Sequence, residues 1–255
     1  MNLYGHTIIY IHKNDCSYLN DVFNITSKNN NCRIILIGDE YNKKYSDKYN
    51  IEFYSIKDYT EEFNYTHISV NIYDYEKICF ERWIILANFI KKHNITDKII
   101  YCDSDNVLLK NITDVDIINN YDILYLGNDE VCVPNLLICN PDVFQIIKQY
   151  IYLFYNRSYD EIYKSIKKIN HHENGILHYS DMWLVKDVFN NISKNTCIFD
   201  ISYNNTKYTI INLENTENTE NIFISNYDQI KNKNIDNIVN IHFNGNNKMY
   251  IKNYI

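Results

Sequence analysis

Residues 98–107 of the 255-residue chain, KIIYCDSDNV, form an apolar run that ends abruptly in Asp103 and Asp105. β-Branched and aromatic residues favour strands, so the run predicts a buried strand over Lys98–Cys102. Open α/β sheets bind ligands beyond the carboxyl ends of their strands, where two neighbouring carboxylates can converge on a divalent cation. A lone pair of this kind also fits a strand-to-loop turn with solvated carboxylates, so the rest of the sequence has to decide.

Short β-branched runs alternate with helical patterns along most of the chain, which is typical of an α/β fold with a mostly parallel sheet. Helices are predicted over about 75–93, from Asn140 as N-cap onward, and from Ser180 or Asp181 onward. Only short strands are expected after residue 200. Further strands are predicted at Ile8–Ile11, Arg33–Ile37, Ile51–Tyr54, Ile123–Leu126 and Leu136–Cys139. Because no Gly- or Pro-rich linker interrupts the chain, we expect one domain, residues 1–255.

The composition excludes several classes of protein. A net charge of −7 argues against a nucleic-acid partner, because proteins that bind nucleic acids usually carry a basic excess. No apolar run approaches the roughly 20 residues of a membrane span, and the N-terminus has no pattern of a signal peptide. Seven cysteines without a CxxC pair indicate reduced thiols, so we expect a cytoplasmic protein.

Two blocks near the middle of the chain, Tyr101–Asp105 and Arg82 on the helix predicted before it, resemble those of the retaining glycosyltransferases of the GT-A fold. The nearest pattern is that of family 8, which includes glycogenin and the lipopolysaccharide galactosyltransferases. Tyr101–Asp105, with the sequence YCDSD, resembles the Y-L-D-x-D block of that family. Arg82 matches an arginine that the family carries on the helix before this strand.

Two further blocks, at the ends of the chain, extend the resemblance. The segment HFNGNNK matches H-x-x-G-x-x-K of the family at His242, Gly245 and Lys248. The segment DCSY matches D-x-x-Y at Asp15 and Tyr18. The four blocks occur in the order of the family and span residues 8–248.

The resemblance implies a fold and a reaction. The expected fold is α/β, of the Rossmann-like GT-A type, with a mixed, mostly parallel central sheet flanked by helices and a small C-terminal β-rich segment. The expected reaction moves a sugar from a UDP-sugar donor, with retention, to a glycan or protein acceptor that the sequence does not identify.

The resemblance also implies a ligand set. Asp103, Asp105 and His242 would hold Mn²⁺ or Mg²⁺ on the diphosphate, and the imidazole favours Mn²⁺, because Mg²⁺ prefers an all-oxygen shell. Lys248 and the backbone around Gly245 would add positive potential where negative charge develops. A polar residue on a terminal strand is the competing interpretation of His242.

Three other residues have expected roles at the donor. Asp15 and Tyr18 would bind the uracil, with the tyrosine stacked on the base, although core packing is an alternative for Tyr18. Arg82 would reach the diphosphate region. The positions three and four residues from it on the predicted helix are Cys79, Ile78, Ile85 and Leu86. Because none of these carries a charge, we expect the ionic partner of Arg82 to lie elsewhere in the fold.

Two blocks depart from the family pattern. Cys132–Leu136 stands where the family has F-N-[SA]-G, which leaves the identity of the transferred sugar open. Ser180–Val185 stands where the family has D-Q-D-x-L-N, and Asp181 then takes the place of the glutamine near the anomeric carbon. Asp181 is either a catalytic carboxylate beside the sugar or the N-cap of its helix, and both roles are compatible.

These observations favour a metal-dependent glycosyltransferase. A sugar-nucleotide-forming nucleotidyltransferase would need a glycine-rich loop after the first strand, and residues 11–18 contain no glycine. The remaining alternative is a catalytically inactive protein of the same fold that binds a UDP-sugar or a glycan, which the lost F-N-[SA]-G block favours.

Overall fold

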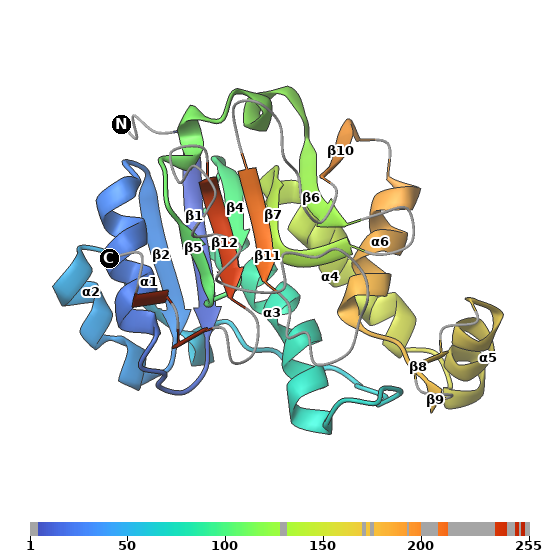
Figure 1. Cartoon of the computed structure of the whole chain (residues 1–255). Helices are drawn as coiled ribbons and strands as arrows, with labels where there is room; N and C mark the ends of the chain where they lie inside the picture. The colour runs from blue at the N-terminus through green and yellow to red at the C-terminus, as the bar shows by residue number, and fades with distance from the viewer. Residues whose placement is uncertain are drawn as a thin grey trace.

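The structure is a computed structural model, and it describes residues 5–127, 132–169, 172–173, 176–192, 194–199, 209–213, 238–243, 248–249 and 251–252 (Figure 1). A seven-stranded sheet forms its centre, with the strand order β10-β6-β7-β4-β1-β2-β3. Adjacent strands are parallel except at β7, which runs antiparallel to both β4 and β6. The strands are β1 (His6–His12), β2 (Arg33–Gly38), β3 (Glu52–Ser55), β4 (Lys98–Cys102), β6 (Ile123–Gly127), β7 (Cys132–Cys139) and β10 (Thr196–Phe199). The six strands predicted before residue 200 are confirmed and all belong to this sheet, in which β10 is an additional strand.

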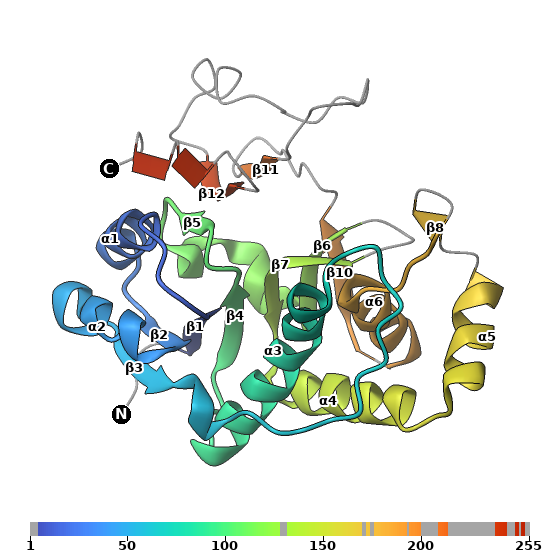
Figure 2. The same cartoon turned by 90° about the horizontal axis from the view of Figure 1, so that it is seen from below.

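Helices cover both faces of this sheet (Figure 2). On one face, α3, α4 and α6 pack on side chains such as Ile9 and Ile99. On the other face, α1 and the C-terminal strands pack on Ile8 and Ile100. Because successive side chains of a strand point to opposite faces, apolar runs such as Ile8–Ile9 and Ile99–Ile100 supply both cores. The helices are α1 (Leu19–Asn29), α2 (Lys44–Tyr49), α3 (Tyr73–Lys92), α4 (Pro141–Tyr155), α5 (Tyr159–Ile169) and α6 (Asp181–Asn191), with 3₁₀ turns at Glu40–Asn42, Ile56–Asp58, Ile112–Asp114 and Asp116–Asn120.

The three predicted helices are present, and one predicted cap is not. α3 buries an apolar face that includes Trp83, and α4 begins with Pro141 in its first turn. Asn140 occupies the N-cap position of α4 but makes no side-chain cap bond. Its amide instead donates to Asp122 Oδ1 at 2.8 Å, because the loop before β6 lies within reach. The capping interpretation of the Asn140 side chain is therefore wrong, although the predicted helix start holds.

A second, small sheet carries the C-terminal strands, as expected. Its order is β11-β12-β5, formed by Thr209–Leu213, Ile238–Phe243 and Asn106–Leu108. β5 follows the two aspartates directly, and β12 pairs with it in antiparallel register. In addition, Phe243 N donates to Asp105 O at 3.0 Å. β12 is thus attached to the loop after β4. The remaining strands, β8 (His172–Glu173) and β9 (Ile176–Leu177), form a short hairpin.

Two expectations concern cellular context. Within the described ranges, no helix is long and apolar enough to cross a membrane. The six cysteines that the structure describes outside the β10 strand are all free thiols, at positions 16, 32, 79, 102, 132 and 139.

Candidate active site

A cavity of about 800 Å³ lies at the carboxyl edge of the central sheet. β1 ends at His12 and β4 ends just before Asp103, and both residues line the cavity. A volume of this size is within the range of small-molecule and cofactor sites. The location agrees with the rule that open α/β sheets bind ligands at the ends of their parallel strands.

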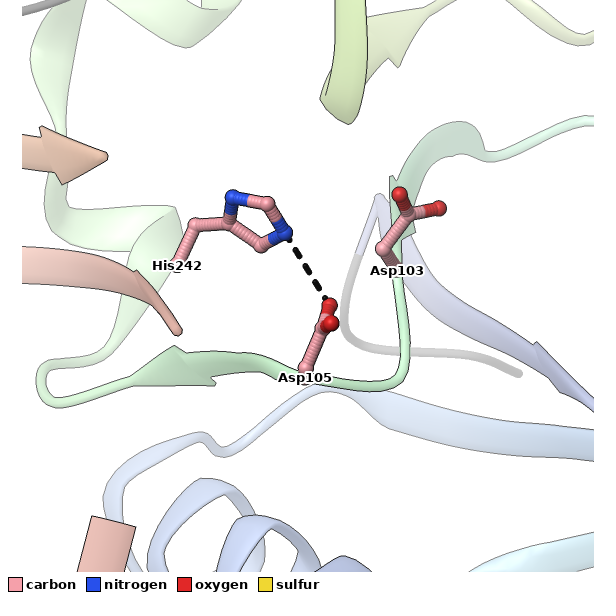
Figure 3. A group of neighbouring side chains, drawn as sticks. All are labelled: Asp103, Asp105 and His242. Atoms are coloured by element: carbon pink, nitrogen blue, oxygen red, sulfur yellow. Dashed lines mark ion pairs between the residues drawn. The ribbon is translucent and has the colours of Figure 1, made fainter. Parts of the chain in front are cut away.

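Three potential metal ligands meet in this cavity. One oxygen or nitrogen atom from each of Asp103, Asp105 and His242 lies within 4.8 Å of the other two (Figure 3). The aspartates come from the loop between β4 and β5, and His242 comes from β12, whose pairing with β5 places it opposite Asn106. A single ion with bonds of about 2.0–2.6 Å reaches ligand atoms up to about 5 Å apart. Two carboxylates and one imidazole are also a donor set that suits Mn²⁺, so this group can hold such an ion.

Charges in this group are strongly coupled. His242 Nε2 lies 3.1 Å from Asp105 Oδ1, and Lys248 Nζ lies 2.8 Å from Asp105 Oδ2. Burial alone would raise the pKa of Asp105, but His242 and Lys248 outweigh it and hold this pKa well below its usual range. Burial would likewise lower the pKa of His242, and Asp105 outweighs it and raises the pKa. Burial raises the pKa of Asp103, against the opposing charge of Arg82. The negative charge of the group is thus balanced by cations around it.

Arg82 has its ionic partners outside its own helix. Its Nη1 lies 2.8 Å from Asp103 Oδ1, and its Nη2 lies 2.5 Å from Asp181 Oδ2. Tyr101 OH also donates to Asp103 Oδ1 at 2.7 Å, and Trp83 Nε1 donates to Asp181 Oδ2 at 2.9 Å. The guanidinium therefore bridges the metal group and the start of α6.

The structure separates the two interpretations of Asp181. The N-cap position of α6 belongs to Ser180, whose side chain makes no cap bond, and Asp181 is the first helical residue. Asp181 is 3% exposed, and its carboxylate is directed at Arg82 and Trp83, on the cavity wall. Asp181 therefore belongs to the cavity by its side chain and begins the helix by its backbone.

The residues predicted for the nucleoside are only partly brought together. Tyr18 lines the cavity, with its OH 3.3 Å from Ser104 Oγ, and Lys248 Nζ lies 5.0 Å from the centre of its ring. Asp15 is not among the cavity-lining residues, and its carboxylate pairs with Lys44 Nζ at 2.6 Å. Gly245 lies outside the described residues.

Several cavity residues were not predicted. Tyr101 is two residues before Asp103, and strand alternation would have placed both on one face. His12 is the last residue of the first strand, with Nδ1 at 2.8 Å from Ser104 Oγ. Glu76 lies in the first turn of α3 and shares a helical face with Trp83 seven positions on. An acid on an otherwise apolar face was the available signal.

The segment that replaces F-N-[SA]-G supports the aspartate loop through its backbone. Asn135 O accepts bonds from Asp103 N at 2.9 Å and from Asn106 Nδ2 at 2.7 Å. Asn135 also lines the cavity. These bonds tie β7 to both ends of the loop that carries Asp103 and Asp105.

No protein-family model matches the chain, and no curated protein sequence matches it. Among solved structures, the chain is similar to mouse xyloside xylosyltransferase 1, with 10% identity, 95% of this chain and 98% of that chain covered, and a TM-score of 0.57. It is also similar to the bifunctional glycosyltransferase WbbM, with 11% identity, 97% and 48% covered, and a TM-score of 0.53. The chain spans 44% of the length of GlyE from Streptococcus pneumoniae, with 12% identity, 76% of this chain covered and a TM-score of 0.41. The chain therefore has a GT-A-like fold, with a mixed, mostly parallel central sheet flanked by helices.

Proposed function

We propose that this protein is a metal-dependent glycosyltransferase of the family 8 type, which transfers a sugar from a UDP-sugar to a glycan or protein acceptor with retention of configuration. The observation that carries this proposal is the convergence of Asp103, Asp105 and His242 in the cavity at the carboxyl edge of a GT-A-like sheet. The fold neighbours that carry glycosyltransferase names support the same class. The free thiols support the cytoplasm as the place of action.

The three ligands would hold Mn²⁺, or Mg²⁺, against the diphosphate of the donor. A divalent cation at this position supplies positive charge to oxygens that become more negative as the sugar leaves. Lys248 adds a second positive charge, 2.8 Å from the Asp105 carboxylate. Interactions that strengthen as the leaving group departs lower the barrier, at roughly tenfold in rate per 1.4 kcal/mol.

Arg82 and Asp181 are the residues we assign to the sugar end. Arg82 fixes the orientation of both Asp103 and Asp181 through its two ion pairs. Asp181 then presents a buried carboxylate that can stabilise positive charge on the sugar ring or accept bonds from donor hydroxyl groups. Tyr18 is assigned to the nucleoside because it lines the cavity beside Lys248. Asp15 and the Gly245 backbone are assigned to the nucleotide by resemblance.

The test is UDP release from UDP-glucose, UDP-galactose, UDP-N-acetylglucosamine and UDP-xylose in the presence of Mn²⁺. We expect turnover of at least one donor by the wild-type chain, and loss of that turnover with EDTA and in Asp105→Asn. Turnover that survives both treatments would contradict the metal role.

The alternative is an inactive protein of the same fold that binds a UDP-sugar or a glycan. The replacement of the F-N-[SA]-G block by Cys132–Leu136 favours this alternative. Calorimetry and the UDP-release assay together separate the two functions. An inactive UDP-sugar binder binds UDP in calorimetry but releases no UDP from any of the four donors.

A further inference from the structure

One wall of the cavity holds a buried carboxyl group that the proposed chemistry does not use. Glu76 lies in the first turn of α3 and is 1% exposed. It lines the same cavity as Arg82 and Asp181. A carboxyl group loses its hydration when it is buried, so both of its oxygens need hydrogen-bond partners.

Only one oxygen of Glu76 has such partners. Ser69 Oγ donates to Oε2 at 3.0 Å, and Asn71 Nδ2 donates to the same atom at 2.7 Å. Oε1 is buried and has no hydrogen-bond partner among the residues described by the structure. Burial also raises the pKa of Glu76, and the bonds from Asn71 and Ser69 offset only part of that rise. The cavity wall thus contains an acceptor oxygen that a bound hydroxyl group would satisfy.

The segment that binds Glu76 is itself held by further contacts. Ser69 Oγ also lies 3.0 Å from His178 Nδ1, and Tyr179 N donates to Ile68 O at 2.8 Å. These contacts join the segment before α3 to the segment before α6. Polar groups that are already held in place lose little entropy when a ligand binds, so this wall is preorganised.

The location of Glu76 indicates which part of a ligand it would meet. Arg82 connects the metal group to Asp181, and the charge of Asp181 in turn acts on Glu76. If the diphosphate lies at the metal group, as proposed above, the sugar end of the cavity lies toward Asp181 and Glu76. A pyranose carries several hydroxyl groups, and hydrogen bonds from hydroxyl groups to carboxylates are among the stronger ones in proteins.

We propose that Glu76 is a sugar-binding residue, whose Oε1 accepts a hydrogen bond from a pyranose hydroxyl group in this part of the cavity. Ser69 and Asn71 are its positioning residues. The inference rests on the proposed function, and the hydroxyl group belongs to the donor sugar or to an acceptor sugar.

The variant Glu76→Gln tests this assignment with little change in shape. Because Ser69 and Asn71 both donate, the glutamine must keep its carbonyl oxygen toward them, which places its NH₂ group where Oε1 was. The change therefore replaces an acceptor by a donor at one atom. Glu62→Gln, at an exposed position, is the control for the loss of one negative charge.

Two arms distinguish the two sources of the hydroxyl group. In calorimetry with Mn²⁺, a donor-sugar role predicts that Glu76→Gln binds the four UDP-sugars about tenfold more weakly and UDP itself unchanged, since a charge-assisted bond is replaced by a neutral one. An acceptor role predicts unchanged binding of UDP and UDP-sugars, unchanged donor hydrolysis, and about tenfold slower transfer to p-nitrophenyl glycosides.

Other outcomes overturn the assignment. Unchanged values in both arms would do so, as would an equal loss of affinity for UDP, which places the effect at the metal group. We also expect Glu76→Gln to melt no lower than the wild type, because the variant replaces a buried carboxylate by a neutral amide, which costs less to desolvate. A lower melting temperature indicates a structural role and overturns the proposal. A wild-type chain that fails to bind UDP contradicts the proposed function itself. A wild-type chain that binds UDP and turns over a donor, together with a Glu76→Gln variant that behaves as the wild type in both arms, contradicts only this subsite.

Discussion

Removing the guanidinium of Arg82 has the largest predicted effect on stability. Its two ion pairs are largely buried, with side-chain exposures of 13% for Arg82, 26% for Asp103 and 4% for Asp181. In Arg82→Met the aliphatic part of the side chain is retained, and both carboxylates lose their cation. Asp103 keeps the bond from Tyr101, and Asp181 keeps the bond from Trp83.

The expected cost follows from this geometry. Breaking a buried ion pair by removing one partner costs about 3–5 kcal/mol, because the other charge stays buried without compensation. Since Asp103 is partly exposed and both carboxylates keep one donor, we expect about 3–5 kcal/mol for the whole site rather than for each pair. For a chain of this size, that corresponds to a melting temperature lower by roughly 6–20 °C.

The assay is thermal and urea denaturation of three variants. Arg33→Met is the matched control, because Arg33 also pairs with a carboxylate, that of Glu52, but at exposures of 23% and 44%. We expect it to cost about 1 kcal/mol or less. The double variant Arg82→Met/Asp181→Asn should regain part of the loss, since a neutral amide needs no cation. Equal melting temperatures for Arg82→Met and Arg33→Met would refute this reasoning, and so would a double variant less stable than Arg82→Met alone.

Two further predictions concern His12 and Lys248. Burial, together with the charge of Lys248, lowers the pKa of His12 to about 4. The unfolded chain therefore binds a proton there that the folded chain does not, and stability should fall by up to about 1.4 kcal/mol per pH unit from about pH 6.5 down to about 4. His12→Gln should show a shallower slope in urea denaturation, and parallel slopes would contradict the prediction. Lys248→Met should weaken the binding of pyrophosphate with Mn²⁺ by about tenfold or more, because a charge-assisted contact is lost. Lys148→Met is its control, and equal affinities of the two variants in calorimetry would rule the role out.

The central sheet was predictable because its signals are local. Each strand is a short apolar run, and β4 is recognisable from KIIYC alone. β10 was not predicted because its short run, TCIF, follows an Asn- and Ser-rich segment without a contrasting pattern. The side-chain hydrogen bond of Asn140 was also not predictable, because its acceptor, Asp122, lies 18 residues earlier in the chain, directly before β6.

The site was predictable where a motif fixes the spacing. The resemblance named Asp103, Asp105 and His242, and the pairing of β12 with β5 brings them together. The resemblance also named Arg82, and the lack of a charged neighbour on its own helix predicted that its ionic partner lies elsewhere in the fold. Glu76 and His178 could not be paired from sequence, since their connection through Ser69 depends on how two distant loops pack.

The metal-dependent binding of UDP tests the central claim most directly. Calorimetric titration of UDP should give a measurable affinity for the wild-type chain with Mn²⁺ and none after EDTA. Asp105→Asn should weaken the Mn²⁺-dependent binding by about a hundredfold or more, since even outer partners of metal ligands contribute about 10- to 100-fold. Asp47→Asn, at an exposed position on α2, should bind UDP as the wild type does. Equal binding of UDP by Asp105→Asn and the wild type in the presence of Mn²⁺, or wild-type binding that persists after EDTA, would contradict the account.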